Sequence, residues 1–264
     1  MKKEIIKTVN YKEYVINIYK DHKAQNPRKW DHNIATFITD GGVLTDCEKT
    51  SVYKTMYALA IDFLSYKHII NSFCKIRKAT IETDGKEKFC NYWDNNKGWC
   101  QIDAEYDDSF SSKILDILTP YELFQILKDS DEVAIFPMAQ QQDGKTRVST
   151  RLCTSYYDNY FIGIAFIDKF TINNYYGDEY IYWHYKGNWK QCALERINME
   201  LATYNGYCNG EVYGYEVIDN NNCIESLGGY YGDFRLPEAI AEAKHTIDKY
   251  IKQPKKLALW HTIE

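Results

Sequence analysis

The chain has 264 residues, of which 45% are hydrophobic and 26% are charged, and its formal net charge is −5. This composition is typical of a globular domain and excludes a disordered, collagenous or low-complexity chain. The acidic balance argues against a protein that grips duplex DNA through many phosphates, although a local basic patch stays open. Tyrosine is the unusual component, with 24 residues against 11 Phe and 6 Trp.

Side-chain patterning predicts strands and helices in the first half of the chain. Alternation with period two indicates strands, and helical spacing of apolar residues indicates helices. In chain order we expect two strands within 4–20, a strand at 34–38, a helix over 51–70, a strand at 75–83 and a helix from 120 to about 128. Thr119, Pro120 and Glu122 mark the start of that last helix as a capping box with proline in the first helical position.

The second half of the chain predicts hairpins separated by helices. In chain order we expect strands at 133–138, 146–153 and 160–167, a helix over 189–205, strands at 211–218 and 223–231, and a helix over 237–251. The tract 219–222 favours a tight turn, because Asp and Asn tolerate positive φ. Hairpin connections predict an α+β fold, with a mainly antiparallel sheet of hairpins and three to four packed helices. No linker is visible, so we expect a single globular domain over 1–264, with a loop or hairpin insertion around 67–112.

The predicted cellular location rests on the lack of a membrane-spanning run and of a signal peptide, and the predicted redox state rests on the spacing of the cysteines. No apolar run is long enough to cross a membrane, and the first residues carry no signal-peptide pattern, so we expect a cytoplasmic protein without membrane contact. The eight cysteines include no pair at zinc-site spacing, which indicates free thiols in a reducing compartment. Cys90 and Cys100 flank a polar loop, and their pairing as a disulfide or metal pair is left open.

No catalytic motif is visible in the chain. A hydrolase elbow, a zinc-protease motif and a glycine-rich phosphate loop are all missing. We therefore expect a protein that is not an enzyme and that needs no cofactor and no metal. A Cys- or His-dependent hydrolase of a nucleotide signal is kept as an alternative, because a nucleophile and a base can meet in space without a sequence motif.

The tyrosines gather in two regions. One holds Tyr residues at 156, 157, 175, 176, 180, 182 and 185 with Trp183, and the other holds Tyr213, Tyr215, Tyr230 and Tyr231. Three interpretations stay open: the rings fill a core, they anchor a protein interface, or they stack single-stranded nucleic acid on a sheet.

Two segments resemble a family of uncharacterised accessory proteins of bacteriophages and mobile elements. They are residues 26–33, NPRKWDHN, and residues 204–219, YNGYCNGEVYGYEVID, running on to 225–232, ESLGGYYG. The family pairs an early N-P-R-x-W-D-N-like segment with a late G-[DE]-V-Y-G-Y hairpin that ends in an aromatic F-Y-G. The matched pieces span 26–234 discontinuously, and the chain replaces the family's usual C-P-W-D-S-G with 153–158, CTSYYD.

The resemblance implies a phage-derived protein that acts in the bacterial host cytosol, and it supplies no catalytic residue. Accessory phage proteins without enzyme motifs often counter host defence, so we expect a non-enzymatic inhibitor, specifically an anti-CRISPR protein that binds a CRISPR effector with or without its guide RNA. The alternative is a protein that binds single-stranded nucleic acid through tyrosine stacking. The candidate partner-binding residues are Tyr213, Tyr215, Asp219, Glu225, Tyr230 and Tyr231, with Arg28, Trp30 and Asp31 as a second set.

Overall fold

The computed structural model describes residues 3–40, 44, 51–84, 87–104, 107–142, 145–150 and 159–252. Across these residues the chain forms eight α-helices and eleven strands, and every paired strand is antiparallel. The predicted α+β class with antiparallel hairpins is thus confirmed. The strands form three sheets, and the described helices outnumber the three to four that we expected.

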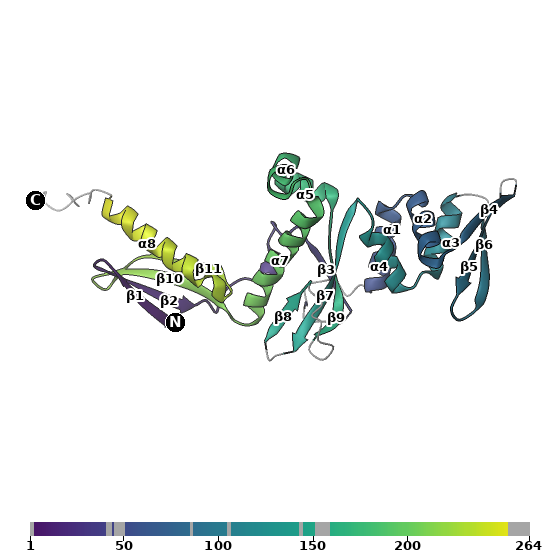
Figure 1. Cartoon of the computed structure of the whole chain (residues 1–264). Helices are drawn as coiled ribbons and strands as arrows, with labels where there is room; N and C mark the ends of the chain where they lie inside the picture. The colour runs from purple at the N-terminus through teal and green to yellow at the C-terminus, as the bar shows by residue number, and fades with distance from the viewer. Residues whose placement is uncertain are drawn as a thin grey trace, which may run out of the picture. The chain divides into compact units, whose positions relative to one another are not determined.

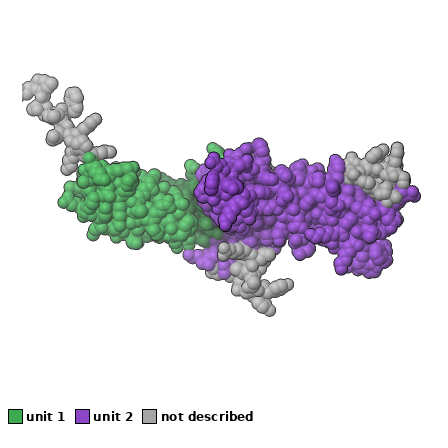
Figure 2. All heavy atoms as spheres, turned by 45° about the horizontal axis from the view of Figure 1, so that its top comes forward, with its two compact units in different colours: residues 1–31, 201–264 green, residues 32–200 purple. Residues whose placement is uncertain are grey.

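The contacts group the chain into two compact units, where the sequence led us to expect one domain (Figure 2). Unit 1 combines residues 1–31 with residues 201–264, and unit 2 comprises residues 32–200. Unit 1 is therefore built from the two ends of the chain. The sequence predicted one domain because no stretch with the composition of a linker lies where the chain passes from one unit to the other, at residues 31–32 and 200–201.

Unit 1 is a four-stranded sheet with one long helix on one face (Figure 1). Its elements are β1 (Glu4–Tyr11), β2 (Tyr14–Lys20), η1 (Pro27–Lys29), β10 (Val212–Asp219), β11 (Asn222–Tyr231), η2 (Asp233–Arg235) and α8 (Leu236–Lys252), with strand order β1-β2-β10-β11. The buried face of α8 repeats at Ala239, Ala243 and Ile247, which is helical spacing, and it packs against Ile16 and Val217 of the sheet.

The hairpin of β10 and β11 has the tight turn that the sequence predicts. Asn220 and Asn221 both have positive φ, 46° and 69°, which is the conformation of a two-residue turn that matches strand twist. The following residues pair back along β10 from Asn222 opposite Asp219 to Tyr231 opposite Val212. The turn sets the pairing next to it, and two irregularities, between Ile218 and Val217 and between Tyr215 and Tyr213, shift the register further along the hairpin.

Unit 2 contains the other two sheets and most of the helices (Figure 1). Its elements are β3 (Thr36–Thr39), α1 (Val52–Phe63), α2 (Tyr66–Arg77), β4 (Thr80–Asp84), β5 (Glu87–Asp94), β6 (Gly98–Ala104), α3 (Asp107–Ile117), α4 (Pro120–Lys128), β7 (Val133–Gln142), β8 (Thr146–Ser149), β9 (Asn159–Asp168), α5 (Lys169–Tyr176), α6 (Asp178–Tyr185) and most of α7 (Trp189–Cys208). The sheets have the orders β3-β9-β7-β8 and β4-β5-β6.

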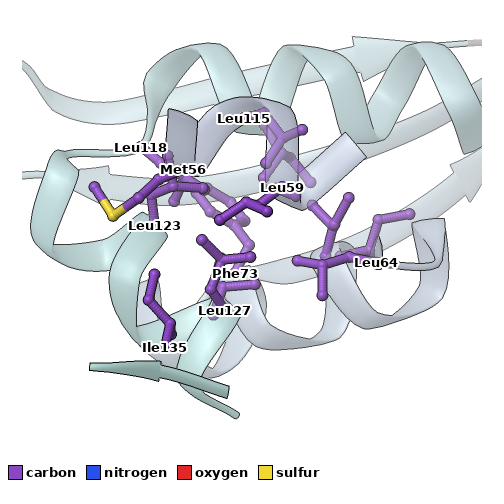
Figure 3. Packing of buried hydrophobic residues seen from close by; sticks show 14 of the residues in the cluster. Met56, Leu59, Leu64, Phe73, Leu115, Leu118, Leu123, Leu127 and Ile135 are labelled. Atoms are coloured by element: carbon purple, nitrogen blue, oxygen red, sulfur yellow. The ribbon is translucent and has the colours of Figure 1, made fainter. Parts of the chain in front are cut away.

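The main core of unit 2 lies among α1, α2, α3 and α4 (Figure 3). Met56 and Leu59 of α1, Phe73 of α2 and Leu123 of α4 are among its buried side chains. The predicted insertion at 67–112 contributes to this core, because Phe73 and the β5 and β6 residues Cys90 and Ile102 belong to the same cluster.

Candidate functional site

The four hairpin tyrosines that were predicted to contact a partner are buried in unit 1. Tyr213, Tyr215 and Tyr230 belong to the core cluster beneath α8, and Tyr231 is buried at the end of β11. A buried ring offers a partner no surface, so this structure corrects the predicted role of these four rings: they pack the unit. For the same reason they form no open stacking platform for single-stranded bases.

The hydroxyl groups of these tyrosines have partners inside unit 1. Tyr213 Oη donates to Asp233, and Tyr230 Oη donates to the Glu242 carboxylate at 2.6 Å. Burial first, and the bond to the carboxylate second, raise the pKa of both phenols above its ordinary value. Each ring therefore fills the core while its polar tip is satisfied, as buried tyrosine requires.

The second predicted set meets the first through one ring contact. Trp30 lies edge to face against Tyr231, with ring centroids 4.9 Å apart, and Tyr231 Oη donates to the Gln25 carbonyl at 2.7 Å. The Asn26 side chain accepts from Arg28 N and starts the short helix η1. Residues 25–30 are thus packed against the end of β11 inside unit 1.

The charged members of the predicted sets lie closer to solvent. Asp31 and Glu225 are exposed, whereas Arg28 and Asp219 are half-buried. Asp219 stands in the β10–β11 turn, opposite Asn222. The four hairpin rings are buried, so they do not form an aromatic interface with these charges.

Exposed aromatic rings are concentrated instead on α5 and α6 of unit 2. We call the exposed rings Phe170, Tyr175, Tyr180, Tyr182 and Trp183 the α5–α6 aromatic surface. The two helices are anchored beneath it by one buried residue each, Ile172 and Ile181. Single exposed apolar residues are ordinary, but several on adjacent helices mark an interaction surface.

Ring stacking orders one side of α6. Tyr180 and His184 are four residues apart on α6, so their rings lie on the same side of that helix, and Tyr176, the last residue of α5, stacks on Tyr180 from across the turn. The Tyr176 and Tyr180 centroids are 5.0 Å apart and the Tyr180 and His184 centroids 4.0 Å apart, both pairs nearly parallel. Gly177, with a φ of 83°, separates α5 from α6 and permits the turn between them.

A buried ion pair on α7 supports this surface from below. Arg196 Nε donates to Glu200 Oε1 at 2.9 Å, and the same oxygen accepts from the N–H groups of Ile34 and Ala35. The Arg196 guanidinium also lies over the Tyr175 ring, 4.7 Å from its centroid. Burial alone would lower the pKa of Arg196, but the charge of the Glu200 carboxylate and the hydrogen bond to it outweigh that effect, so the pKa of Arg196 is raised.

The six described cysteines are free thiols that differ in burial. Cys90 and Cys100 are both free, and in the β5–β6 ladder Cys90 pairs with Ile102 while Cys100 pairs with Tyr92. Burial raises the pKa of the thiols of Cys74, Cys90 and Cys192, that of Cys90 to about 12, which suppresses the thiolate that a nucleophile needs. Among the described residues no three His, Cys, Asp or Glu side chains gather in a metal-binding group.

Two global observations complete the description. None of the described helices is both long and apolar enough to cross a membrane. No protein-family model, curated protein or solved structure matches the chain.

Proposed function

We propose that the protein is a non-enzymatic inhibitor of a bacterial defence system, specifically an anti-CRISPR protein that binds a CRISPR nuclease effector, with or without its guide RNA. The observation that carries the binding role is the α5–α6 aromatic surface. Tyrosine and tryptophan dominate the energetics of protein interfaces, because each offers a large area with few rotatable bonds. The defence role rests on the resemblance to phage accessory proteins.

The charges around this surface favour a protein partner over nucleic acid. Between residues 169 and 186, Lys169 and Lys186 are balanced by Asp178 and Glu179. Binding of nucleic acid draws most of its affinity from an excess of Lys and Arg over phosphates. Balanced charge around exposed rings is the composition of a protein-binding patch with a polar rim.

Two consecutive short helices also suit recognition by a preformed surface. Asp168 caps α5 by accepting from Thr171 N at 2.8 Å, and Tyr185 Oη donates to Glu195 of α7 at 3.0 Å. These contacts hold both ends of the α5–α6 pair. A preordered surface loses less entropy on binding than a flexible one.

The direct test is affinity purification of the tagged full chain from a bacterium that carries a CRISPR system under phage challenge. We expect a nuclease effector to co-purify and phage plating to rise. A partner-free protein that fails to protect phage across a panel of defence strains would overturn the proposal. Salt-dependent binding to bare single-stranded oligonucleotide without effector binding would favour the nucleic-acid alternative.

A matched pair of substitutions assigns the binding to α5 and α6. Tyr182→Ala combined with Trp183→Ala should weaken effector binding about 30-fold or more, as loss of interface hot spots does. Tyr121→Ala is the control, because Tyr121 and Trp183 are equally exposed, at 72% each, and Tyr121 lies on α4. Equal effects of the two changes would remove α5 and α6 from the interface.

A further inference from the structure

The small sheet β4-β5-β6 has one face in the core, and its other face carries side chains that the described residues leave largely exposed. Its inner face carries Cys90, Tyr92 and Ile102, which are buried in the main core of unit 2. Strand register places the opposite side chains in rows, because partners in an antiparallel pair share a face. Three rows of described side chains lie on this outer face: Trp93 and Trp99; Thr80, Asn91 and Gln101; and Glu82, Phe89 and Asp103. Asp84 lies on the same face, further along β4.

Two tryptophans dominate the outer face. Their ring centroids are 5.8 Å apart with an interplanar angle of 81°, so the edge of one ring meets the face of the other. Trp93 is 49% exposed and Trp99 is 74% exposed. Phe89, further along the same face, is half-buried. Contiguous exposed apolar surface of this kind is typical of interaction sites.

The end of the hairpin that carries the tryptophans is held in place. The Asp94 carboxylate accepts from Asn96 N at 2.9 Å and from Lys97 N at 3.0 Å, and Arg77 of α2 lies 3.7 Å from it. Gly98 has a φ of 81°, and Trp93 lies against it. The tryptophan pair is thus presented on a fixed turn, which reduces the entropy lost on binding.

The described charged side chains of the outer face are all negative. Its described charged side chains are the carboxylates of Glu82, Asp84 and Asp103. The nearby cations lie off the face: Lys97 is in the turn, and Lys113 of α3 donates to the Asp103 carbonyl. Indole faces attract cations, guanidinium most often, and carboxylates bind guanidinium through paired hydrogen bonds. Phosphates are repelled by such a face.

We infer that the outer face of β4-β5-β6 docks an arginine-bearing basic segment of the partner protein. One arginine would stack on Trp99, and a second would reach the carboxylates of Glu82 and Asp103. Trp99 and Asp103 are four residues apart on β6, about 13 Å along the strand, which an extended segment of similar length spans. Basic, arginine-bearing segments are typical of proteins that bind nucleic acid, as a CRISPR effector does, so the inference deepens the proposed function and rests on it.

The test measures binding of the full chain to a synthetic nine-residue arginine peptide, with a lysine peptide of equal length and a single-stranded oligonucleotide as comparisons. We expect the arginine peptide to bind more tightly than the lysine peptide, because only guanidinium stacks and pairs in two hydrogen bonds at once. The affinity should fall with rising salt. Equal binding of both peptides, or preference for the oligonucleotide, would overturn the inference.

Substitutions locate the binding on the outer face. Trp99→Ala should weaken arginine-peptide binding about 2- to 30-fold, the range of a cation–π contact from exposed to desolvated. Glu82→Gln with Asp103→Asn should weaken it and flatten its salt dependence. The matched control is Asp219→Asn with Glu225→Gln, which removes the same charge from unit 1. Equal effects of the two charge pairs would show attraction to net charge alone and overturn the inference.

The same variants separate this inference from the proposed function. If the protein antagonises a defence system and Trp99→Ala leaves effector binding unchanged, the outer face is not the docking site and the function stands. If no defence nuclease is bound while the arginine peptide still requires Trp99 and the carboxylates, the proposed defence role fails and the basic-segment site stands.

Discussion

The Trp30 ring meets the Tyr231 ring edge to face, with centroids 4.9 Å apart, although the two residues lie 201 positions apart in the sequence. The contact joins the early N-P-R-x-W-D-like segment to the last residues of the late hairpin. Both residues belong to unit 1, and each ring covers apolar surface of the other.

Removal of the Trp30 ring should destabilise unit 1. Trp30→Ala is expected to lower the free energy of unfolding by about 2–3 kcal/mol, because a half-buried indole loses both its burial and its ring contact. Trp30→Phe should retain most of that stability. Urea titration followed by circular dichroism measures the change, and Trp99→Ala, at an exposed ring, is the control. Equal losses for the Trp30→Ala and Trp99→Ala variants would contradict the packing role.

In unit 1 the main chain at Gly206 lies close to the main chain at Gly232. A Cβ on Gly206, at the end of α7, would lie 2.5 Å from the Gly232 nitrogen, which is main chain and cannot move aside cheaply. Gly206→Ala should therefore destabilise the protein by about 1–3 kcal/mol. Gly228→Ala is the control, because its Cβ would meet only the flexible Asp21 carboxylate. Thermal unfolding of both variants measures the difference, and comparable melting temperatures would refute the steric account.

Features decided by a few neighbouring residues could be predicted from the sequence. Thr119 and Glu122 form the expected capping box: Glu122 accepts from Thr119 N at 2.9 Å, and Thr119 Oγ1 accepts from Glu122 N at 3.3 Å. The turn at Asn220 and Asn221 is likewise a local preference for positive φ. Such signals need no knowledge of what packs against the segment.

Features decided by weaker or distant signals were missed. The predicted helix over 51–70 is two helices, because Ser65 caps a new one by accepting from His68 N at 3.2 Å. The pair α5 and α6 was not predicted, since each helix buries only one residue, Ile172 or Ile181, and gives no apolar stripe.

The role of the hairpin rings depended on a partner far along the chain. Alternation along β10 shows that Tyr213 and Tyr215 share a face, but it does not say which face is covered. That choice is made by α8, whose residues 236–252 supply the other half of the core. The exposed rings Tyr175, Tyr180, Tyr182 and Trp183, which the sequence showed only as one group of neighbouring aromatic residues, belong to the α5–α6 aromatic surface instead.

The buried ion pair on α7 should be sensitive to loss of either partner. Glu200→Ala leaves Arg196 charged in a buried site and removes the acceptor for the N–H groups of Ile34 and Ala35, so we expect a loss of about 3–5 kcal/mol. A double-mutant cycle with Arg196→Met measures the coupling. The double variant should be less destabilised than the sum of the single variants. Strict additivity would show that the two side chains act independently.

Alkaline pH should destabilise the protein through its buried phenols. The pKa values of Tyr213 and Tyr230 are raised, chiefly by burial and then by bonds to carboxylates. As the pH rises past about 10, the unfolded chain therefore releases these protons before the folded chain does. The contribution of the two phenols to the free energy of unfolding is complete below that pH and is lost as the pH rises above it. Phenolate absorbance and circular dichroism, recorded together, should show one group of tyrosines ionising only as structure is lost. Tyr230→Phe should shrink that step, whereas Tyr121→Phe, at an exposed ring, should leave it unchanged. Ionisation of all tyrosines with the circular dichroism intact would contradict the burial of these hydroxyls.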